Sequence, residues 1–329
     1  MNAAIWRGLR TVRPIPLTSA LREEIAHWLF LQTWDNPLPW RDERHIHVKI
    51  ASDASGSGWG GSIISPGNQV VSDYWTQEEQ IWDICVKEAA ALEKVLLAFQ
   101  DQLVNTRVDA LVDNQAVVSS WNNQGGRSVL LTRVMKRLFF TTAKLNISLH
   151  LSYIPTGDNP ADLPSRRLSS MDSRLHPNVW WNVQRLFGGP DGHTCDFMAL
   201  DSNAMTDSQG HPLPHFTPGP SPRSSGVNLF AQDLSRCDPV LTYPYVFPPL
   251  NLVGPVLRFL KCHNRSCTLV TIDVYPRRYW WPLLQRYSTN SMKLDVEGST
   301  KALLIPTRNG WSAHPGLPGD LWGFALDFS

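Results

Sequence analysis

The sequence has few of the features that mark several common protein classes. Its 329 residues include only five cysteines without an even spacing, so we do not expect a disulfide-bonded scaffold. No apolar run approaches the roughly 18 residues that a membrane-spanning helix needs. Charged residues make up only 18% and the formal net charge is +1, which excludes an overall basic or acidic chain. With no visible secretion signal, we expect reduced thiols and a cytoplasmic or nuclear protein that is not secreted and not in a membrane.

Proline, tryptophan and apolar residues are what the sequence does contain. The apolar classes reach 42%, enough for a sizeable core, and the length suggests about two domains. Five of the 25 prolines fall in residues 207–223, which predicts an extended loop. We expect an N-terminal helix and tether in residues 1–44, with Ser19 as its cap, and one domain in residues 45–170. Residues 171–329 would form a second domain.

Residues 45–170 predict an alternation of strands and helices. Three antiparallel strands come first, followed by a helix whose apolar stripe includes Leu92, Val95, Leu96 and Phe99. A strand, two helices, a fifth strand and a short last helix follow. The expected strands are 46–52, 58–65, 69–75, 107–112 and 146–154, and the expected helices are 84–102, 114–122, 128–143 and one starting near Ala161. The fold class is therefore α/β.

Four acidic residues stand at informative places in this pattern. Asp53 and Asp113 come at strand ends, where α/β sheets expose functional groups. Glu88 continues the apolar stripe of its helix, and Asp162 opens the last helix. Carboxylates that converge repel one another, and divalent metals relieve this; oxygen ligands favour Mg²⁺ or Mn²⁺. Taken singly, each acid is more typical of a turn, a helix cap or a partly exposed helix position than of a functional site, and their joint order is what favours function.

Four segments resemble the type I ribonuclease H domain of retroelement polymerases. They are SDASGSGWGG (52–61), KEAAAL (87–92), VDNQAVV (112–118) and YIPTGDNPADLPSR (153–166). The resemblance implies a five-stranded mixed sheet flanked by helices. It also implies that Asp53, Glu88, Asp113 and Asp162 bind two Mg²⁺ or Mn²⁺ ions, with Asp158 a rival for the last position. The implied reaction is two-metal cleavage of the RNA strand of an RNA/DNA hybrid, with RNA identified by its 2′-hydroxyls.

Further residues are candidates for contacts with nucleic acid. Ser55 and Asn114 could donate to its oxygens, although a role in a turn is equally compatible with both. Residues 114–157 contain bases but no acid, which favours a basic helical face beside an acidic site. The bases proposed for this face are Arg127, Arg133, Lys136 and Arg137. A solvated helix face is the alternative.

The C-terminal half resembles the region that follows ribonuclease H in DIRS-like, tyrosine-recombinase retrotransposons. The segments HPNVWWNVQRLFGG (176–189) and YVFPPLNLVGPVLRFL (245–260) are among those that carry the resemblance. Their order also resembles adenine-N6 DNA methyltransferases, which need a polar residue before Pro-Pro and an aromatic after it. Phe247 and Leu250 occupy those positions here. We therefore expect a second α/β domain that resembles a degenerate, inactive methyltransferase.

Three functions remain open at this stage. The resemblance favours an active retroelement ribonuclease H whose reverse transcriptase, encoded elsewhere or lost, would be a partner beside the RNA/DNA hybrid. A silent or domesticated copy that only binds nucleic acid is the first alternative, and a transposase or resolvase of the same fold is the second. The aromatic and basic run at 277–281 fits base stacking, but packing in a core is more typical of paired tryptophans.

Overall fold

A computed structural model describes residues 17–33, 46–125, 128–235 and 238–329. The chain divides into two compact units, Met1–Arg44 and His45–Ser329. In the first unit, helix α2 (Ser19–His27) is followed by the 3₁₀ helix η1 (Trp28–Thr33). Its cap is Thr18 rather than the expected Ser19, because the Thr18 hydroxyl accepts from the Leu21 amide at 3.3 Å. The expected tether function stays a prediction.

The second unit begins with a five-stranded mixed sheet, which confirms the expected architecture. Its strands are β1 (His47–Ala54), β2 (Gly58–Ser65), β3 (Gln69–Tyr74), β4 (Arg107–Val112) and β5 (Ser148–Tyr153). The order is β3-β2-β1-β4-β5, with β1, β2 and β3 antiparallel and β1, β4 and β5 parallel. Because β1 and β4 are parallel neighbours, their carboxyl ends lie side by side at one edge.

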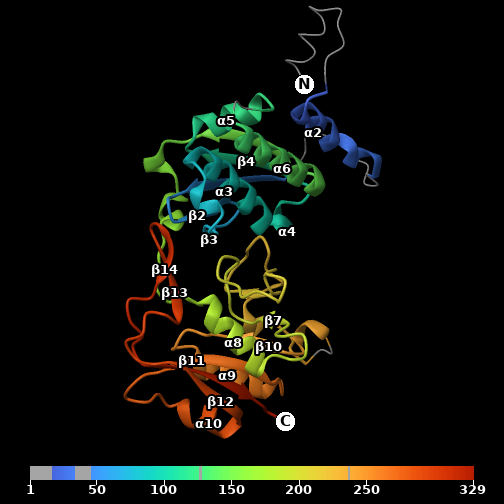
Figure 1. Cartoon of the computed structure of the whole chain (residues 1–329). Coiled ribbons are helices and arrows are strands. Elements are labelled where there is room, and N and C mark those ends of the chain that lie inside the picture. The colour runs from blue at the N-terminus through green and yellow to red at the C-terminus, as the bar shows by residue number, and fades with distance from the viewer. Residues whose placement is uncertain (1–16, 34–45, 126–127, 236–237) are drawn as a thin grey trace, which may run out of the picture. The chain divides into compact units, whose positions relative to one another are not determined.

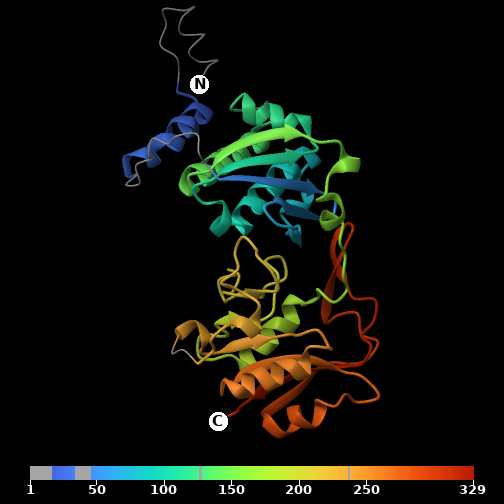
Figure 2. The ribbon, with the colours of Figure 1, turned by 180° about the vertical axis from the view of Figure 1, so that it is seen from behind.

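Helices α3 and α6 pack on one face of this sheet, as the two opposite views show (Figures 1 and 2). The elements between and after the strands are η2 (Glu79–Ile81), α3 (Ile84–Ala98), α4 (Gln100–Leu103), α5 (Gln115–Asn122), α6 (Val129–Leu145), η3 (Thr156–Asp158) and α7 (Asp162–Ser165). The predicted stripe of α3 is confirmed, since Leu92, Val95, Leu96 and Phe99 are all buried in the core. Burial of this stripe against the sheet provides much of the stability of α3.

Two glycines of β2 explain how helices reach the sheet so closely. A Cβ atom on Gly61 would lie 2.1 Å from Cγ2 of Val95 on α3. A Cβ atom on Gly60 would lie 2.5 Å from the amide nitrogen of Ser165 on α7. Only glycine permits both approaches, and the second one brings α7 against the end of β1 that carries Asp53.

A second five-stranded sheet follows in the same unit. Its strands are β7 (Cys195–Asp196), β10 (Pro244–Val246), β11 (Cys267–Asp273), β12 (Ser288–Asp295) and β15 (Asp320–Leu326), and its helices are α8 (Pro177–Phe187), α9 (Val253–Cys262) and α10 (Trp281–Tyr287). The order is β12-β15-β11-β10-β7, with β7, β10 and β11 parallel and the β15 pairings antiparallel. This arrangement is mixed α/β, as expected. We call residues 46–170 the first domain and residues 171–329 the second domain, following the predicted boundary.

Smaller elements complete the second domain. They are β6 (Arg174–Leu175), β8 (Phe216–Thr217), β9 (Gly226–Val227), η4 (Leu229–Ala231), η5 (Pro239–Leu241), β13 (Leu303–Thr307) and β14 (Gly310–Ala313). Strands β14, β13 and β6 form a three-stranded sheet. Residues 207–223, all described, contain the short strand β8, two residues in isolated bridges, and otherwise turns and irregular chain. Trp280 and Trp281 are buried, so core packing is the interpretation that the structure supports.

Membrane and disulfide features can be stated for the described residues only. No helix among them combines the length and apolar character needed to cross a bilayer. The described cysteines Cys85, Cys195, Cys262 and Cys267 are free thiols.

Candidate active site

Three of the four predicted acids converge where β1 and β4 end. Asp53 is the second-to-last residue of β1, and Asp113 directly follows β4, whose Val112 pairs with Ser52. Glu88 approaches from the face of α3 that packs on the sheet. One ligand oxygen from each of Asp53, Glu88 and Asp113 lies within 4.8 Å of the others. The parallel pairing of β1 and β4 is therefore what brings acids 60 residues apart together.

Burial and mutual repulsion dominate the electrostatics of this group. Burial, together with the charges of Asp113 and Asp53, raises the pKa of Glu88 to about 9. Burial likewise raises the pKa of Asp53 to about 6; the Ser165 hydrogen bond opposes this rise, whereas the charges of Asp113 and Asp162 add to it. Without a cation, Glu88 therefore keeps its proton at neutral pH. A divalent ion would reverse this preference by favouring all three charged carboxylates.

The donor set fits a divalent cation. Oxygen Oε2 of Glu88 is buried and has no hydrogen-bond partner in the described part of the chain. A buried polar atom without a partner is costly, and a bound cation would satisfy it. Carboxylate oxygens are ligands preferred by Mg²⁺ and Mn²⁺. Among the described residues, these acids are the one group of histidine, cysteine or acidic side chains with metal-ligand spacing.

Asp162, the fourth predicted acid, lies beside this group and outside it. It opens α7 and pairs with Arg166, whose guanidinium nitrogen NH2 lies 2.7 Å from Oδ1 of Asp162. Its charge still contributes to the raised pKa of Asp53. The rival Asp158 is exposed in η3. The metal role of Asp162 stays a prediction, and the structure adds that Arg166 neutralises its charge in the metal-free chain.

The structure identifies three supporting residues that the sequence reasoning did not assign. Ser165 donates its hydroxyl to Oδ2 of Asp53 at 2.5 Å. Asn159 donates its side-chain amide to the Ser52 carbonyl at 3.0 Å and more weakly to Oδ1 of Asp53 at 3.4 Å. The Thr156 hydroxyl donates to Oδ2 of Asp113 at 2.9 Å. All three belong to the segment at 153–166, so its run of hydroxyl and amide side chains around Asp162 was the available signal.

The residues predicted to contact nucleic acid are placed in different ways. The Ser55 hydroxyl is buried and donates to the Ser165 carbonyl at 2.6 Å, which joins the loop after β1 to α7. The Asn114 side chain caps α5 by accepting from the amides of Ala116 and Val117. Both side chains thus have local structural roles, and their contacts with nucleic acid stay predictions.

The predicted basic face lies on α6. Arg133 is exposed and Lys136 is half-buried on this helix. Arg137 instead makes a bidentate pair with Glu93 of α3, with its closest N–O distance 2.8 Å, so it helps to hold the two helices together. Arg127 lies outside the described residues. Contacts of these four bases with nucleic acid stay predictions.

No protein-family model matches the sequence, and no curated protein matches it. In structure, the chain is similar to RNase H1 from the halophilic archaeon Halobacterium salinarum NRC-1, with 18% identity and a TM-score of 0.29 over 36% of this chain and 94% of that one. LC11-RNase H1 in complex with RNA/DNA hybrid is 20% identical, with a TM-score of 0.29 over 36% of this chain and 92% of that one. A foamy viral protease-reverse transcriptase in complex with double-stranded DNA is 16% identical, with a TM-score of 0.27 over 43% of this chain and 30% of that one.

Proposed function

We propose that this protein is a ribonuclease H that cleaves the RNA strand of RNA/DNA hybrids with divalent metal ions. The observation that carries the proposal is the group formed by the buried Asp53 and Glu88 and the half-buried Asp113, whose ligand oxygens lie within 4.8 Å of one another. Its position at the carboxyl ends of β1 and β4 agrees with the sequence resemblance at all three acids. The unpartnered Oε2 of Glu88 adds a specific reason for a cation.

The residues of the chain would divide the work as follows. Asp53, Glu88 and Asp113 would hold two Mg²⁺ or Mn²⁺ ions, with Asp162 as the fourth predicted ligand. Such ions would supply an activated water and stabilise the leaving oxygen of the scissile phosphate. Ser165 and Asn159 orient the carboxylate of Asp53, and Thr156 orients that of Asp113. The site is open to substrate on the side of Asp113, which is only half-buried.

The finer identity is also part of the proposal. We infer a retroelement origin of the DIRS-like kind, a reverse transcriptase partner, and a cytoplasmic or nuclear location; the sequence segments named above support the first two. We infer that the second domain is a methyltransferase-like fold without activity, because Phe247 and Leu250 flank Pro-Pro and both pack against its core. Incubation with a labelled methyl donor and DNA is expected to leave adenine unlabelled, and labelled adenine would overturn this inference.

The test of the main proposal is cleavage of a hybrid labelled on its RNA strand. The full chain is incubated with Mg²⁺, Mn²⁺ or EDTA, with single-stranded RNA and duplex DNA as control substrates. We expect metal-dependent cutting of RNA in the hybrid alone. Asp53→Asn is expected to abolish cutting with the fold intact, whereas Asp101→Asn, at an exposed position on α4, is the matched control.

The same assay separates the alternatives. Retained cleavage in Asp53→Asn would contradict the assigned site. Binding of the hybrid without cutting by the unsubstituted chain would instead indicate the silent copy that only binds nucleic acid. Cutting of duplex DNA would favour a transposase or resolvase.

A further inference from the structure

A hairpin of the second domain reaches the loop that follows Asp53. Strands β13 and β14 are joined by a tight turn at Arg308 and Asn309, and Thr307 pairs with Gly310. Gly310 has a φ of 103°, a conformation that glycine adopts without strain. A Cβ atom on Gly56 would lie 3.6 Å from the Arg308 carbonyl, and one on Gly310 would lie 3.3 Å from Cγ of Gln80. The tip of the hairpin thus contacts the loop that follows β1, three residues after a candidate metal ligand.

An aromatic contact holds the hairpin in this place. Trp311 of β14 packs edge-to-face on Tyr74 at the end of β3, with ring centroids 5.7 Å apart. The guanidinium of Arg174 stacks over the same Trp311 ring, 4.9 Å from its centroid. The Tyr74 hydroxyl donates to Asp172 at 2.7 Å. Together these contacts fix the base of the turn against the first domain.

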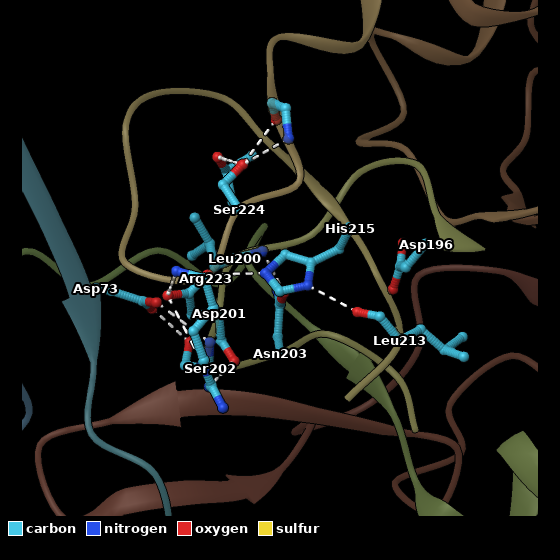
Figure 3. A network of polar contacts seen from close by, with 12 residues as sticks. Asp73, Asp196, Leu200, Asp201, Ser202, Asn203, Leu213, His215, Arg223 and Ser224 are labelled. Carbon is cyan, nitrogen blue, oxygen red and sulfur yellow. Dashed lines mark hydrogen bonds and ion pairs between the residues drawn. The ribbon is translucent and has the colours of Figure 1, made fainter. Parts of the chain in front are cut away.

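A second, polar contact joins the domains at the neighbouring residue of β3. The buried carboxylate of Asp73 accepts from the Ser202 amide at 3.1 Å and from the Ser202 hydroxyl (Figure 3). Beside it, Asp201 accepts from His215 at 2.7 Å and from the Arg223 amide at 3.0 Å. Two independent contacts on adjacent residues of one strand therefore fix the second domain, and with it the hairpin, on the first.

The tip presents a cation that has no ionic partner among the described residues. Arg308 and Asn309 are both exposed, and no acid of the described chain pairs with Arg308. Two cations of the first domain near the same edge already have partners. Arg166 pairs with Asp162, and the Lys87 ammonium donates to the carbonyls of Gly56 and Gln80. Arg308 thus brings an exposed cation of the second domain to the Gly56 loop.

We propose that the tip of the β13–β14 hairpin is a nucleic-acid contact, in which Arg308 binds a backbone phosphate of the hybrid beside Asp53. A guanidinium suits this role because its planar set of donors matches phosphate oxygens. A cation here also offsets the repulsion between a polyanionic substrate and the acidic site. The inference rests on the proposed function and assigns the second domain a role, which is to hold this hairpin at the edge of the site.

The test is hybrid binding by the full chain carrying Asp53→Asn, with Mg²⁺ present, measured by fluorescence anisotropy at several salt concentrations. Adding Arg308→Ala is expected to weaken binding roughly fivefold and to reduce the slope of log affinity against log salt by about 1. Arg308→Lys, which keeps the charge, is expected to restore the slope. Arg258→Ala, at an exposed position on α9, is the matched control and should change neither quantity.

Two results would overturn the inference. Unchanged affinity and slope in the Arg308→Ala chain would show that the tip makes no phosphate contact. Tighter binding would show that the tip obstructs the path of the hybrid. Either can occur while the chain with Asp53 intact still cleaves RNA, so they leave the proposed function standing. Absence of both cleavage and binding before any change at Arg308 would instead refute the proposed function, and this inference with it.

Discussion

Glu88 has a more strongly raised pKa than Asp53, so a bound cation would change its protonation more. Its pKa is raised to about 9, and its Oε2 atom has no hydrogen-bond partner among the residues that the structure describes. A cation must therefore displace a proton from this carboxyl when it binds. Metal affinity should rise with pH between about 6 and 9, which is the interval set by the pKa values of Asp53 and Glu88.

We predict that Mg²⁺ raises the melting temperature of the unsubstituted chain, and raises it more at pH 8.5 than at pH 6. In Glu88→Gln the shift with Mg²⁺ should be lost, because a neutral amide gives the ion neither charge nor a second carboxylate oxygen. Melting curves with and without Mg²⁺ at both pH values measure this. Asp101→Asn is the control, and a shift in Glu88→Gln as large as in the parent would contradict the assignment.

Ser165 is a positioning residue for Asp53. Its hydroxyl hydrogen bond at 2.5 Å favours the charged carboxylate and lowers the pKa of Asp53 from the still higher value that burial would give it. We predict that Ser165→Ala reduces kcat about tenfold. The acidic limb of the pH–rate profile should also move to higher pH, which a purely structural defect would not cause. Steady-state cleavage from pH 5 to pH 9 checks this.

Ser119→Ala, at an exposed position on α5, is the matched control for Ser165→Ala. It removes a hydroxyl of the same size away from the carboxylates. An equal loss of activity in both variants, or a profile that does not move in Ser165→Ala, would remove the positioning role.

At the scale of elements, contacts between helices and β2 determine how the acids meet. Helix α3 carries Glu88 and packs on β2 through Gly61, whereas α7 carries Ser165 and packs through Gly60. Each approach requires a residue without a Cβ atom. The two glycines therefore set how closely α3 and α7 pack on β2. The sequence motif W-G-G therefore has a packing explanation that does not depend on substrate.

We predict that Gly61→Ala lowers the free energy of unfolding by about 1–3 kcal/mol, because the new methyl group would overlap Val95 and force α3 outward. Gly219→Ala, where nothing lies within 4 Å of the added carbon, is the control and should change it by less than about 0.5 kcal/mol. Urea denaturation measures both. A larger cost in the control would contradict the packing argument.

At the scale of the whole molecule, the buried contact of Asp73 with Ser202 joins the two domains of the second unit. Burial raises the pKa of Asp73 from its ordinary value of 3.8 to about 7, partly offset by hydrogen bonds from Ser202 and the Tyr74 amide. Because the folded pKa is the higher one, the carboxyl stabilises the protein fully below about pH 4. This contribution is lost as the pH rises toward 7.

We predict that the free energy of unfolding of the unsubstituted chain falls relative to that of Asp73→Asn between pH 4 and pH 7.5. Asparagine keeps an acceptor for Ser202 but does not ionise, so it removes this part of the pH dependence. Urea denaturation at four pH values gives the difference, with Asp101→Asn as the control. Parallel curves for the parent and Asp73→Asn would contradict the raised pKa.

Much of the first domain could be predicted from its sequence. The five strands of the sheet and the apolar stripe of α3 depend on periodicity over neighbouring residues, which short-range sterics and burial dictate. Strand ends also placed Asp53 and Asp113 correctly at one edge. The sequence did not reveal which partners side chains with several polar groups close by would contact. Ser55 faces the Ser165 carbonyl, and Asp162 pairs with Arg166 outside the three-carboxylate group, because partners in space decide these choices.

The sequence by itself determined which residues form the candidate site and the order of the elements that hold them. Only the tertiary structure decided that Glu88 is left with an unpartnered oxygen, that Ser165 and Asn159 orient Asp53, and that Arg308 stands beside Gly56. The physical reason is the separation along the chain of the residues that interact. Periodicity and capping act between residues a few positions apart, whereas the desolvation and contacts of the site arise from segments more than 100 residues apart that meet only when the sheets and domains pack.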